Sequence, residues 1–340
     1  MPTACIQYPG TRVSLESEHL ELRPPEGEGA PPRRDIPLRD IDRVILSESV
    51  SITSPALAAL VRRGIPVSLM AGRGRFLGSF LPATPDHGAA RIRQYQRPLE
   101  PEFALPIAGR IIAAKIYNQR RLIQRVAANR RAAGNTVTGH VPEALDHLDR
   151  LLAATSRAPS IPVLRGLEGT AAASYFAAWA SLFPPEFPFV RRSTRPPLNP
   201  VNAALSFSAT LVYNEMHAAI HARGLDAALG LLHTTENGRW SLALDLMEPF
   251  RPVVAEALTL DLFSHRILNA EHFESRGGGI YLNATGRAKH ILQYEKRMGR
   301  QFMSESAGHR TTLRQQLENQ AALLKSGLDD PTVFEPFLMN

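Results

Sequence analysis

The chain has 340 residues, 39 basic and 32 acidic side chains that give a formal net charge of +7, and 44% hydrophobic residues. This length and hydrophobic content predict a folded protein of two domains and exclude a mainly disordered chain. The single cysteine, Cys5, excludes an internal disulfide and a cysteine-based zinc cluster. A metal would therefore have to be held by histidine and carboxylate groups.

The first quarter of the chain has the pattern of β-strands. Short apolar runs such as RVSL, HLELR and RVIL are separated by turn residues between Thr3 and about Phe80. One helix is expected in PALAALVRRG, because Pro55 suits a first helical turn and Gly64 can end a helix. We therefore predict a β-rich domain over residues 1–83.

Two segments of this domain are predicted to be connections. PPEGEGAPP, at residues 24–32, combines proline and glycine with charge and is typical of a mobile hairpin connection. GRGRFLG, at residues 72–78, lacks the spacing of a dinucleotide-binding motif and is interpreted as a hairpin turn.

The second part of the chain has a helical pattern. Several prolines and no sustained period between Pro82 and Pro106 predict a linker at residues 84–104. Beyond it, apolar residues recur near a 3.6-residue period, as at Ile112 and Ile116, which predicts a bundle of amphipathic helices over residues 105–340. The fold class is therefore α+β, with a small β-rich domain followed by a larger all-α domain.

The sequence shows neither a membrane span nor a secretion signal. No stretch approaches the roughly 18 uninterrupted apolar residues that cross a bilayer, and the start MPTACIQYPGTR lacks a charged and then apolar run. We expect a cytoplasmic protein without membrane contact.

The positive charge is concentrated in clusters. Residues 91–135 carry ten basic residues against two glutamates, a surplus of eight that exceeds the surplus of the whole chain. Arginine binds phosphate with a planar fork of donors, so these clusters favour DNA or RNA over an ordinary solvated helix face. The candidate contacts are Arg110, Arg120, Arg121, Arg125, Arg191, Arg192, Arg195, Arg287 and Lys289.

Carboxylates in apolar surroundings are candidates for a Mg²⁺ or Mn²⁺ site, because these ions prefer oxygen ligands. Glu168 lies in LRGLEGTAAASYF between Gly166 and Gly169, which would allow a ligand or another backbone to approach closely. Alone, Glu168 would more often be an exposed helix glutamate. The glycines favour a functional role.

A second candidate region is LGLLHTTENGRWSLALDLMEPFRP. His233 ends an apolar run, and the spacing of Asp245 and Glu248 predicts that both lie on one face of a helix. Two acids among so many apolar side chains need a compensating metal or a cation such as Arg251. A lone histidine is more often a buried core residue, but beside two acids and Glu168 a metal ligand is favoured.

These segments, in this order, resemble a known family. IPLRDIDRVILSESVSITSPALAALVRRGIPVSLM, LRGLEG, RPPLNPVNAALSF with LVYNE, LLH and SLALDLMEPFRP are similar to the CRISPR-associated integrases of spacer acquisition, the CRISPR-associated protein 1 family. The resemblance runs from about Tyr8 to Met298.

The resemblance implies roles for individual residues. Glu168, His233 and Glu248 correspond to the ligands of a Mg²⁺ or Mn²⁺ ion. Tyr213 matches an active-site tyrosine, Asp245 a second acid that many relatives have, and Asn202 a residue near the site. These six side chains form the expected catalytic set.

The resemblance also implies a reaction and partners. The expected reaction is a metal-dependent transesterification in which the 3′-hydroxyl of a captured DNA fragment attacks a phosphodiester of the CRISPR repeat; with water instead, the site cleaves DNA. The expected assembly is a homodimer formed through the β-rich domains, with the small ferredoxin-like CRISPR-associated protein 2 bridging two dimers.

Two other functions stay open in the sequence. The chain could be a DNA-binding scaffold without turnover, or a metal-dependent phosphohydrolase of small phosphates, for which the many arginines would be surplus. The segment after Gly299 is predicted to be a helix and a tail that serve packing, partner docking or DNA contact.

Overall fold

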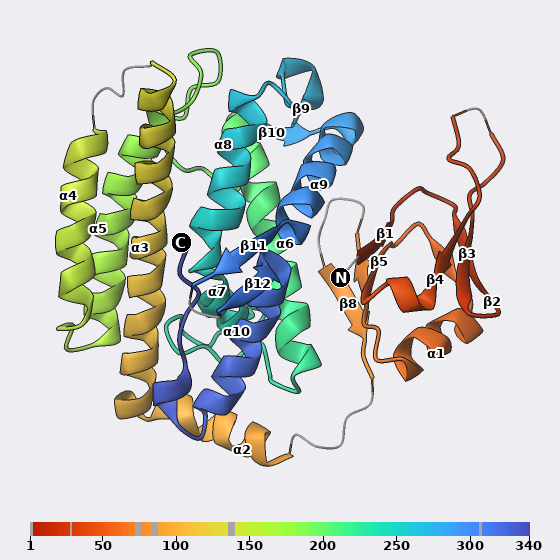
Figure 1. Ribbon diagram of the computed structural model, residues 1–340, viewed down its shortest axis with the longest axis horizontal. Coiled ribbons are helices and arrows are strands. Elements are labelled where there is room, and N and C mark those ends of the chain that lie inside the picture. Colours follow the sequence, from red (N-terminus) through yellow and green to blue (C-terminus); the bar gives the residue numbers. More distant parts are fainter. Residues whose placement is uncertain (1–2, 28, 72–75, 83–87, 135–139, 306–307) are drawn as a thin grey trace. The chain divides into compact units, whose positions relative to one another are not determined.

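The computed structural model describes residues 3–27, 29–71, 76–82, 88–134, 140–305 and 308–340. The chain divides into two compact units. The first comprises the chain up to Gly88 with Ala218–Leu225, and the second comprises Ala89–His217 and Asp226–Asn340. The first is rich in strands and the second in helices (Figure 1), which confirms the α+β fold class.

In the part of the first unit that the structure describes, two four-stranded sheets accompany the helix α1 and the end of α6. One sheet has the strand order β1-β5-β7-β8, in which only β8 is antiparallel to its neighbour. The other sheet has the order β4-β3-β2-β6, in which β4, β3 and β2 form an antiparallel meander and β6 runs parallel to β2. The bounds are β1 Thr3–Ile6, β2 Arg12–Glu16, β3 His19–Arg23, β4 Arg34–Pro37, η1 Leu38–Asp40, β5 Arg43–Ser47, β6 Ser51–Ile52, α1 Ser54–Arg62, β7 Val67–Met70 and β8 Phe76–Phe80.

The predicted helix and hairpins of this unit are present where the structure describes them. Helix α1 has a proline in its first turn, and Gly64 follows its end with φ +73°. The segment 24–32 connects the antiparallel strands β3 and β4, as predicted. The predicted turn at 72–78 lies largely outside the described residues. Alternating apolar residues of the strands, including Val13, Leu20 and Val44, form a core with α1.

The second unit is mainly helical. Helices α3, α4 and α5 pack against one another, and α3 also contacts α7 and the π-helix η3 (Figure 1). The helices are α2 Gly88–Gln96, η2 Arg97–Leu99, α3 Pro101–Ala132, α4 Val141–Thr155, α5 Ile161–Ala180, α6 Pro200–Ala222, α7 Ser241–Met247, η3 Arg251–Glu256, α8 Ala257–Ser264, η4 Ala270–His272, α9 Ala284–Gly299, α10 Leu313–Gly327 and η5 Pro331–Val333. The strands are β9 Phe273–Arg276, β10 Gly279–Leu282, β11 Gln301–Ser304 and β12 His309–Thr312.

Two predictions about this unit are wrong in part. The predicted linker is folded from Gly88 onward into α2, η2 and the start of α3. Tertiary contacts hold it: Gln94 exchanges two hydrogen bonds with the backbone of Asp226, and Arg97 donates to the carbonyl of Leu328. The unit is also not all-α, because β9–β10 and β11–β12 form two hairpins. The first turns at Gly277 and Gly278, both with positive φ.

The C-terminal tail packs against α3. Asn118, which is fully buried, donates to the carbonyls of Pro249 and Phe337 at 2.7 and 3.0 Å and accepts from the amide of Met339 at 2.7 Å. The ring of Phe337 stacks on Phe250 at 5.0 Å. Of the three roles considered for this segment, packing is the one that these contacts demonstrate.

We therefore expect Asn118→Ala to lower the free energy of unfolding by about 1–3 kcal/mol, since two buried carbonyls and one partly buried amide lose their partner. Urea denaturation measures this change. Asn129→Ala on the exposed face of the same helix is the control and should change stability by less than about 0.5 kcal/mol. Equal effects of the two substitutions would contradict the role of Asn118.

A buried histidine connects α9 to α6. His290 is fully buried, its Nε2 lies 2.8 Å from the hydroxyl of Ser208, and its ring meets Phe207 edge-on. Burial lowers the pKa of His290 to about 3, because the charged imidazolium would lose its hydration. The neutral form is therefore the one that fits the fold.

This burial predicts an acid-sensitive fold. The unfolded chain binds a proton at His290 below about pH 6.5 while the folded chain does not, so stability falls as pH decreases from about 6.5 toward 3. We expect a loss of about 2 kcal/mol between pH 7.5 and pH 5 from this group. Urea denaturation at both pH values should show a smaller loss for His290→Gln and an unchanged loss for the exposed His265→Gln.

Candidate active site

The centre of the candidate site is a buried lysine between two glutamates. Lys115 of α3 contacts Oε1 of Glu168 on α5, and its Nζ lies 2.6 Å from Oε2 of Glu248 at the end of α7. The side chains of Lys115 and Glu248 are 7% and 2% exposed, and that of Glu168 is 22% exposed. Two of the three predicted metal ligands thus face one cationic position, with a path to solvent on the side of Glu168.

The charges around Glu248 keep it ionised. Burial alone raises the pKa of Glu248, but the positive charges of Lys115 and Arg251 outweigh it and lower the pKa to about 2. Burial lowers the pKa of Lys115, and the charges of Glu248 and Glu168 more than reverse this. Arg251 donates to Oε1 of Glu248 at 3.2 Å. The site is therefore a cluster of compensated charges.

His233 is held by a buried carboxylate. Its Nδ1 lies 2.6 Å from Oδ1 of Asp245, which also accepts from the amide of His233, while Oδ2 accepts from the amides of Leu231 and Leu232. Asp245 is fully buried. Because a carboxylate surrounded by N–H donors acts as the acceptor, Nδ1 of His233 carries the proton and Nε2 keeps its lone pair. Asp245 thus orients His233.

The loop that carries His233 depends on two further residues. A Cβ atom at Gly230 would collide with the carbonyl of His233 and with the side chain of Ser241, so only glycine lets the loop close around Asp245. Arg165 of α5 donates to the carbonyl of Leu232 from both Nε and Nη2, at 3.0 and 2.6 Å. Arg165 therefore fixes this loop to the helix that carries Glu168.

Asp245 and Glu248, which were predicted to lie on one face of a helix, bind different partners. Helix α7 ends at Met247, and Glu248 is the residue that follows its last turn. Asp245 binds the loop of His233, whereas Glu248 binds Lys115 and Arg251. Asp245 therefore holds the loop of His233, and Glu248 belongs to the charge cluster around Lys115.

The donor set fits a hard divalent cation such as Mg²⁺ or Mn²⁺. Within the described residues, no group of three or more His, Cys, Asp and Glu side chains is gathered as metal ligands. The carboxylates of Glu168 and Glu248 nevertheless meet at the ammonium of Lys115. Oε2 of Glu248 is a buried oxygen without a hydrogen bond of regular geometry. A histidine whose other nitrogen binds a carboxylate is the usual form of a metal-ligating imidazole. The position of the Lys115 ammonium marks where these oxygens converge.

A second buried layer lies behind Glu248. Glu256, at the end of η3, is 1% exposed, and burial raises its pKa despite the opposing charge of Arg251. Burial raises the pKa of Tyr175 well above its ordinary value, and the negative charge of Glu256 adds to this. Burial and the charge of Arg251 lower the pKa of Arg192 to about 10. A π-helix is often found at functional sites, and here it carries Arg251 and Glu256.

Tyr213 and Asn202 have structural contacts in the same unit. The hydroxyl of Tyr213 accepts a 3.3 Å hydrogen bond from the amide of Trp240, and the two rings stack. Burial raises the pKa of Tyr213. Asn202 is fully buried; its Oδ1 accepts from the amide of Ser193 and from Arg192. Asn202 thus positions the segment of the arginine cluster at 191–195.

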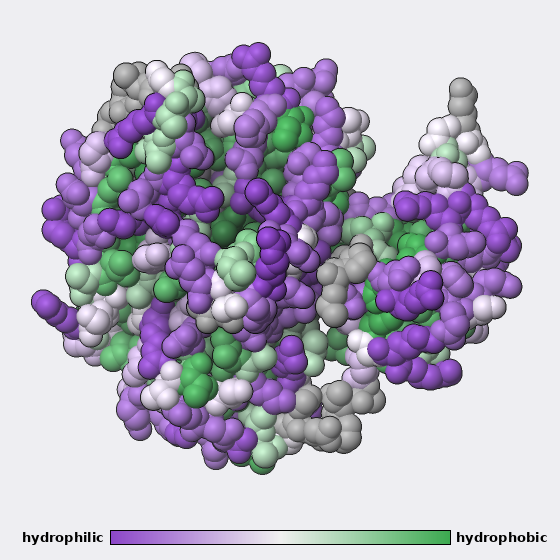
Figure 2. Space-filling model, viewed as in Figure 1, coloured by the Kyte–Doolittle hydropathy of each residue, from purple (hydrophilic) through white to green (hydrophobic). Residues whose placement is uncertain are grey.

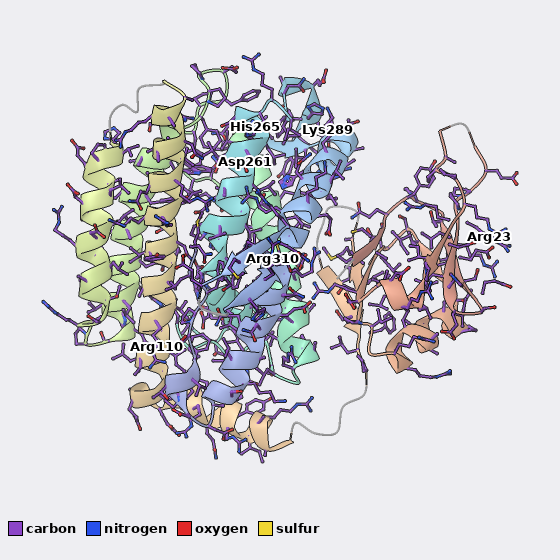
Figure 3. All side chains as sticks on the ribbon, in the orientation of Figure 1. Arg23, Arg110, Asp261, His265, Lys289 and Arg310 are labelled. Carbon is purple, nitrogen blue, oxygen red and sulfur yellow. The ribbon has the colours of Figure 1, made fainter. Side chains whose placement is uncertain are left out.

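The predicted DNA-binding residues fall into two groups. Five of them bind groups of the protein: Arg110 the carbonyls of Pro331 and Phe334, Arg120 the carboxylate of Asp149, Arg121 the carbonyl of Asn340, Arg192 the side chain of Asn202, and Arg287 the carbonyl of Leu282. The exposed ones are Arg125, Arg191, Arg195 and Lys289. Arg110 and Lys289 lie well apart on the helical unit (Figure 3). The face shown in Figure 2 is mainly hydrophilic.

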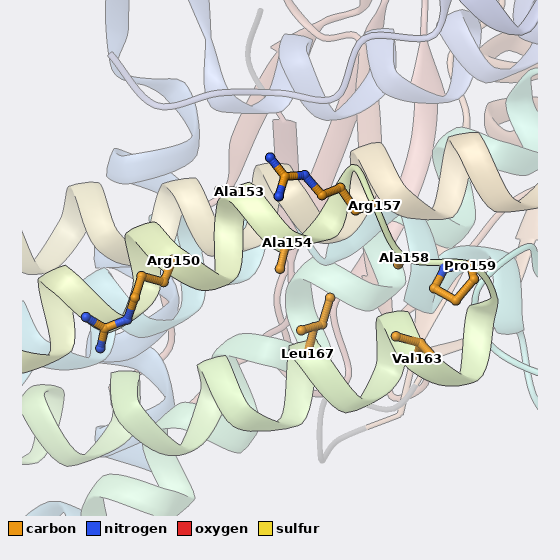
Figure 4. A pocket seen from close by; sticks show the side chains of 8 residues that line it. All are labelled: Arg150, Ala153, Ala154, Arg157, Ala158, Pro159, Val163 and Leu167. Atoms are coloured by element: carbon orange, nitrogen blue, oxygen red, sulfur yellow. The ribbon is translucent and has the colours of Figure 1, made fainter.

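The surface beside Glu168 is open. Cβ atoms at Gly166 and Gly169 would meet nothing within 4 Å, so these glycines leave a bare helix face. A pocket of about 330 Å³ lies at the junction of α4 and α5, where Arg150 and Arg157 stand beside apolar residues such as Leu167 (Figure 4). These two arginines were not among the predicted contacts.

Sequence reasoning missed the role of Lys115, which it counted only in a basic cluster. A signal was present, since Lys115 stands between the apolar runs IIAA and IY of a predicted amphipathic helix. A lysine on the buried face of a helix needs an acidic partner. The same argument that selected Glu168 and Glu248 could have selected it.

Comparisons with known proteins identify the family. The family described as CRISPR associated protein Cas1 matches residues 4–296. The chain belongs to the CRISPR-associated Cas1 family. This confirms the resemblance drawn from the ordered sequence segments.

Several curated relatives are similar over most of this chain. A CRISPR-associated exonuclease Cas4/endonuclease Cas1 fusion of Rhodospirillum rubrum is 36% identical, over 94% of this chain and 54% of the relative. A CRISPR-associated endonuclease Cas1 of Thermus thermophilus is 32% identical, over 88% of this chain and 87% of the relative. The chain thus spans about half the length of the fusion protein and most of the shorter relative.

Solved structures show the same fold. A casposase bound to integration product has a TM-score of 0.79 at 22% identity, over 97% of this chain and 91% of the casposase. A CAS1 protein from Thermotoga maritima has a TM-score of 0.75 at 23% identity, over 100% and 99% of the two chains.

Where the structure describes the chain, none of its helices has both the length and the apolar character of a membrane span.

Proposed function

We propose that this protein is a CRISPR adaptation integrase, a metal-dependent DNA endonuclease and transesterase that joins the 3′-hydroxyl ends of DNA fragments to the CRISPR repeat. The observation that carries the proposal is the convergence of Glu168 and Glu248 on one cation, beside a histidine held by Asp245. Membership of the Cas1 family and relatives named as endonucleases support it.

The proposed ligands of Mg²⁺ or Mn²⁺ are Glu168, Glu248 and Nε2 of His233. When bound, such an ion polarises a phosphodiester and neutralises charge that develops during the displacement. Asp245 holds the imidazole in the tautomer that leaves Nε2 available. Arg251 keeps the buried Glu248 ionised. Exposed Arg125, Arg191 and Arg195 are proposed to bind phosphates, which gives affinity that weakens with salt.

The proposed chemistry exchanges one phosphodiester for another. The attacking 3′-oxygen forms a bond to phosphorus while the bond to the leaving 3′-oxygen of the repeat breaks, and the leaving oxygen takes up a proton in place of the one lost. The number of phosphodiester bonds is unchanged, so the reaction needs no external energy source. The side chain of Glu168 is 22% exposed, which is the side from which the DNA backbone is proposed to reach the site.

The proposed partners are DNA, a second copy of this chain, and the small ferredoxin-like CRISPR-associated protein 2. One structurally similar chain comes from a Cas6-RT-Cas1–Cas2 complex, with a TM-score of 0.77 at 24% identity over 100% of this chain and 36% of that chain. The homodimer, formed through the β-rich domains, and the partner that bridges two dimers are part of the proposal.

The test incubates the protein and its small partner with a repeat-containing plasmid and a DNA fragment, in Mn²⁺ or in EDTA. We expect a covalent joint only with Mn²⁺ and a free 3′-hydroxyl, and none with a 3′-dideoxy fragment. DNA binding without nicking or joining would instead indicate a scaffold. Hydrolysis of a small phosphate ester that excess branched duplex DNA does not inhibit would indicate a phosphohydrolase.

A further inference from the structure

The ammonium of Lys115 occupies the position at which two proposed metal ligands meet. It contacts Glu168 and lies 2.6 Å from Oε2 of Glu248, and its side chain is 7% exposed. The residues one turn before and after it on the same face of α3, Ile112 and Asn118, are fully buried. Lys115 therefore emerges from a packed helix face directly into the site rather than reaching in from the surface.

The charges of this cluster are already balanced. Glu168 and Glu248 face the positive charges of Lys115 and Arg251, and behind them the buried Glu256 faces Arg251 and Arg192. A divalent cation bound to the same oxygens would add two positive charges next to an ammonium. Like charges at this distance repel strongly in a poorly solvated site, so both cations cannot hold the same oxygens.

Glu168 and Glu248 differ in their exposure to solvent and in the partners that would remain if Lys115 were absent. Glu248 is almost fully buried, keeps Arg251 as a partner, and meets Lys115 through an oxygen that lacks regular hydrogen-bond geometry. Glu168 is 22% exposed on the open side of α5. A cation from solvent can therefore reach the oxygen pair from the side of Glu168, while the ammonium reaches it from α3.

We propose that Lys115 and a divalent cation compete for Glu168 and Glu248, so that Lys115 stabilises the metal-free fold and weakens metal binding. This inference rests on the metal site of the proposed function. Lys115 would then have two separable effects. In the absence of metal it is the cationic partner of the buried carboxylate of Glu248, and in its presence it raises the metal concentration at which the site is half occupied.

The test measures Mn²⁺ binding by calorimetry and thermal unfolding in EDTA and in Mn²⁺, for the unaltered chain and for Lys115→Met. We expect Lys115→Met to bind Mn²⁺ at least ten-fold more tightly. We also expect a lower Tm in EDTA and a larger rise of Tm with Mn²⁺. Lys296→Met, at an exposed position of α9, is the matched control and should leave both measurements unchanged. Equal or weaker Mn²⁺ binding by Lys115→Met would overturn the inference.

Two further variants separate charge from folding. Lys115→Arg keeps the positive charge and should gain no Mn²⁺ affinity. Lys115→Met/Glu248→Gln removes both members of the pair and should be more stable in EDTA than Lys115→Met alone. A Lys115→Met protein that does not fold even in Mn²⁺, while this double variant folds, would contradict the replacement of the ammonium by the metal.

A third variant locates the binding. Lys115→Met/Glu168→Gln should lose the gain in affinity, and a gain that persists would place the ion elsewhere and overturn the inference. If the unaltered chain binds Mn²⁺ and joins DNA while Lys115→Met shows no gain, only the inference fails. If neither the unaltered chain nor Lys115→Met binds Mn²⁺ and no joining occurs, the proposed function fails as well.

Discussion

Glu168→Gln is expected to reduce Mn²⁺-dependent nicking and strand joining by about 10²–10³-fold while DNA binding persists. Glu168 is the more exposed member of the carboxylate pair, at 22%, and its replacement removes one negative oxygen from the proposed ion. Loss of metal-assisted charge stabilisation is worth several kcal/mol at the transition state. Plasmid nicking and fragment joining measure activity, and a gel-shift assay with branched duplex DNA measures binding.

The matched control for this prediction is Glu143→Gln, which removes an exposed glutamate from the neighbouring helix α4. It should leave nicking, joining and binding unchanged. Full activity of Glu168→Gln would remove the glutamate from the catalytic machinery. Loss of DNA binding together with activity would show that Glu168 acts on the substrate's affinity rather than on the reaction.

The second large effect is expected for Asp245→Asn. In the unaltered chain the carboxylate of Asp245 accepts four hydrogen bonds, three of them from backbone amides. The side-chain amide of asparagine would replace one accepting oxygen with an NH₂ group that points at these donors. We expect a loss of about 2–4 kcal/mol in the free energy of unfolding, since buried donors lose their acceptor. Activity should fall by about 10–100-fold, because the imidazole of His233 loses its fixed tautomer.

Urea denaturation and the joining assay test this prediction together. Asp146→Asn, on the exposed face of α4, should change neither quantity. Raising the Mn²⁺ concentration should partly restore the activity of Asp245→Asn if Asp245 acts by orienting His233. Unchanged stability would show that the loop at residues 230–233 does not depend on this carboxylate.

Local patterns predicted most of the secondary structure. The β-rich start, the helix at PALAALVRRG and the series of amphipathic helices could be predicted because strand alternation, a proline start and a 3.6-residue period are properties of short segments. The boundary between the two units falls within the predicted linker, at Gly88, but the linker is helical from there onward because Gln94 and Arg97 bind groups more than one hundred residues away. The hairpin after Phe273 was missed because its strands have only four residues each.

The site was predicted only in part. Glu168, Glu248 and His233 could be selected because charged or titratable groups in apolar segments require compensation. The compensating group, Lys115, was not selected, because it was one of ten basic residues in a segment with a strong surplus of charge. The arginines at positions 110, 120 and 121 were assigned to DNA for the same reason, although they bind groups of the protein.

The sequence by itself determined the fold class, the family and the acids that need a cation, because these follow from short-range patterns and from the order of conspicuous segments. Only the tertiary structure decided which cation meets them: α3, α5 and the end of α7 bring Lys115, Glu168 and Glu248 together from distant parts of the chain. It also gave Asp245 and Glu248 different partners despite their close spacing. The physical reason is that charge compensation acts through space, at distances of a few ångströms that chain separation does not encode.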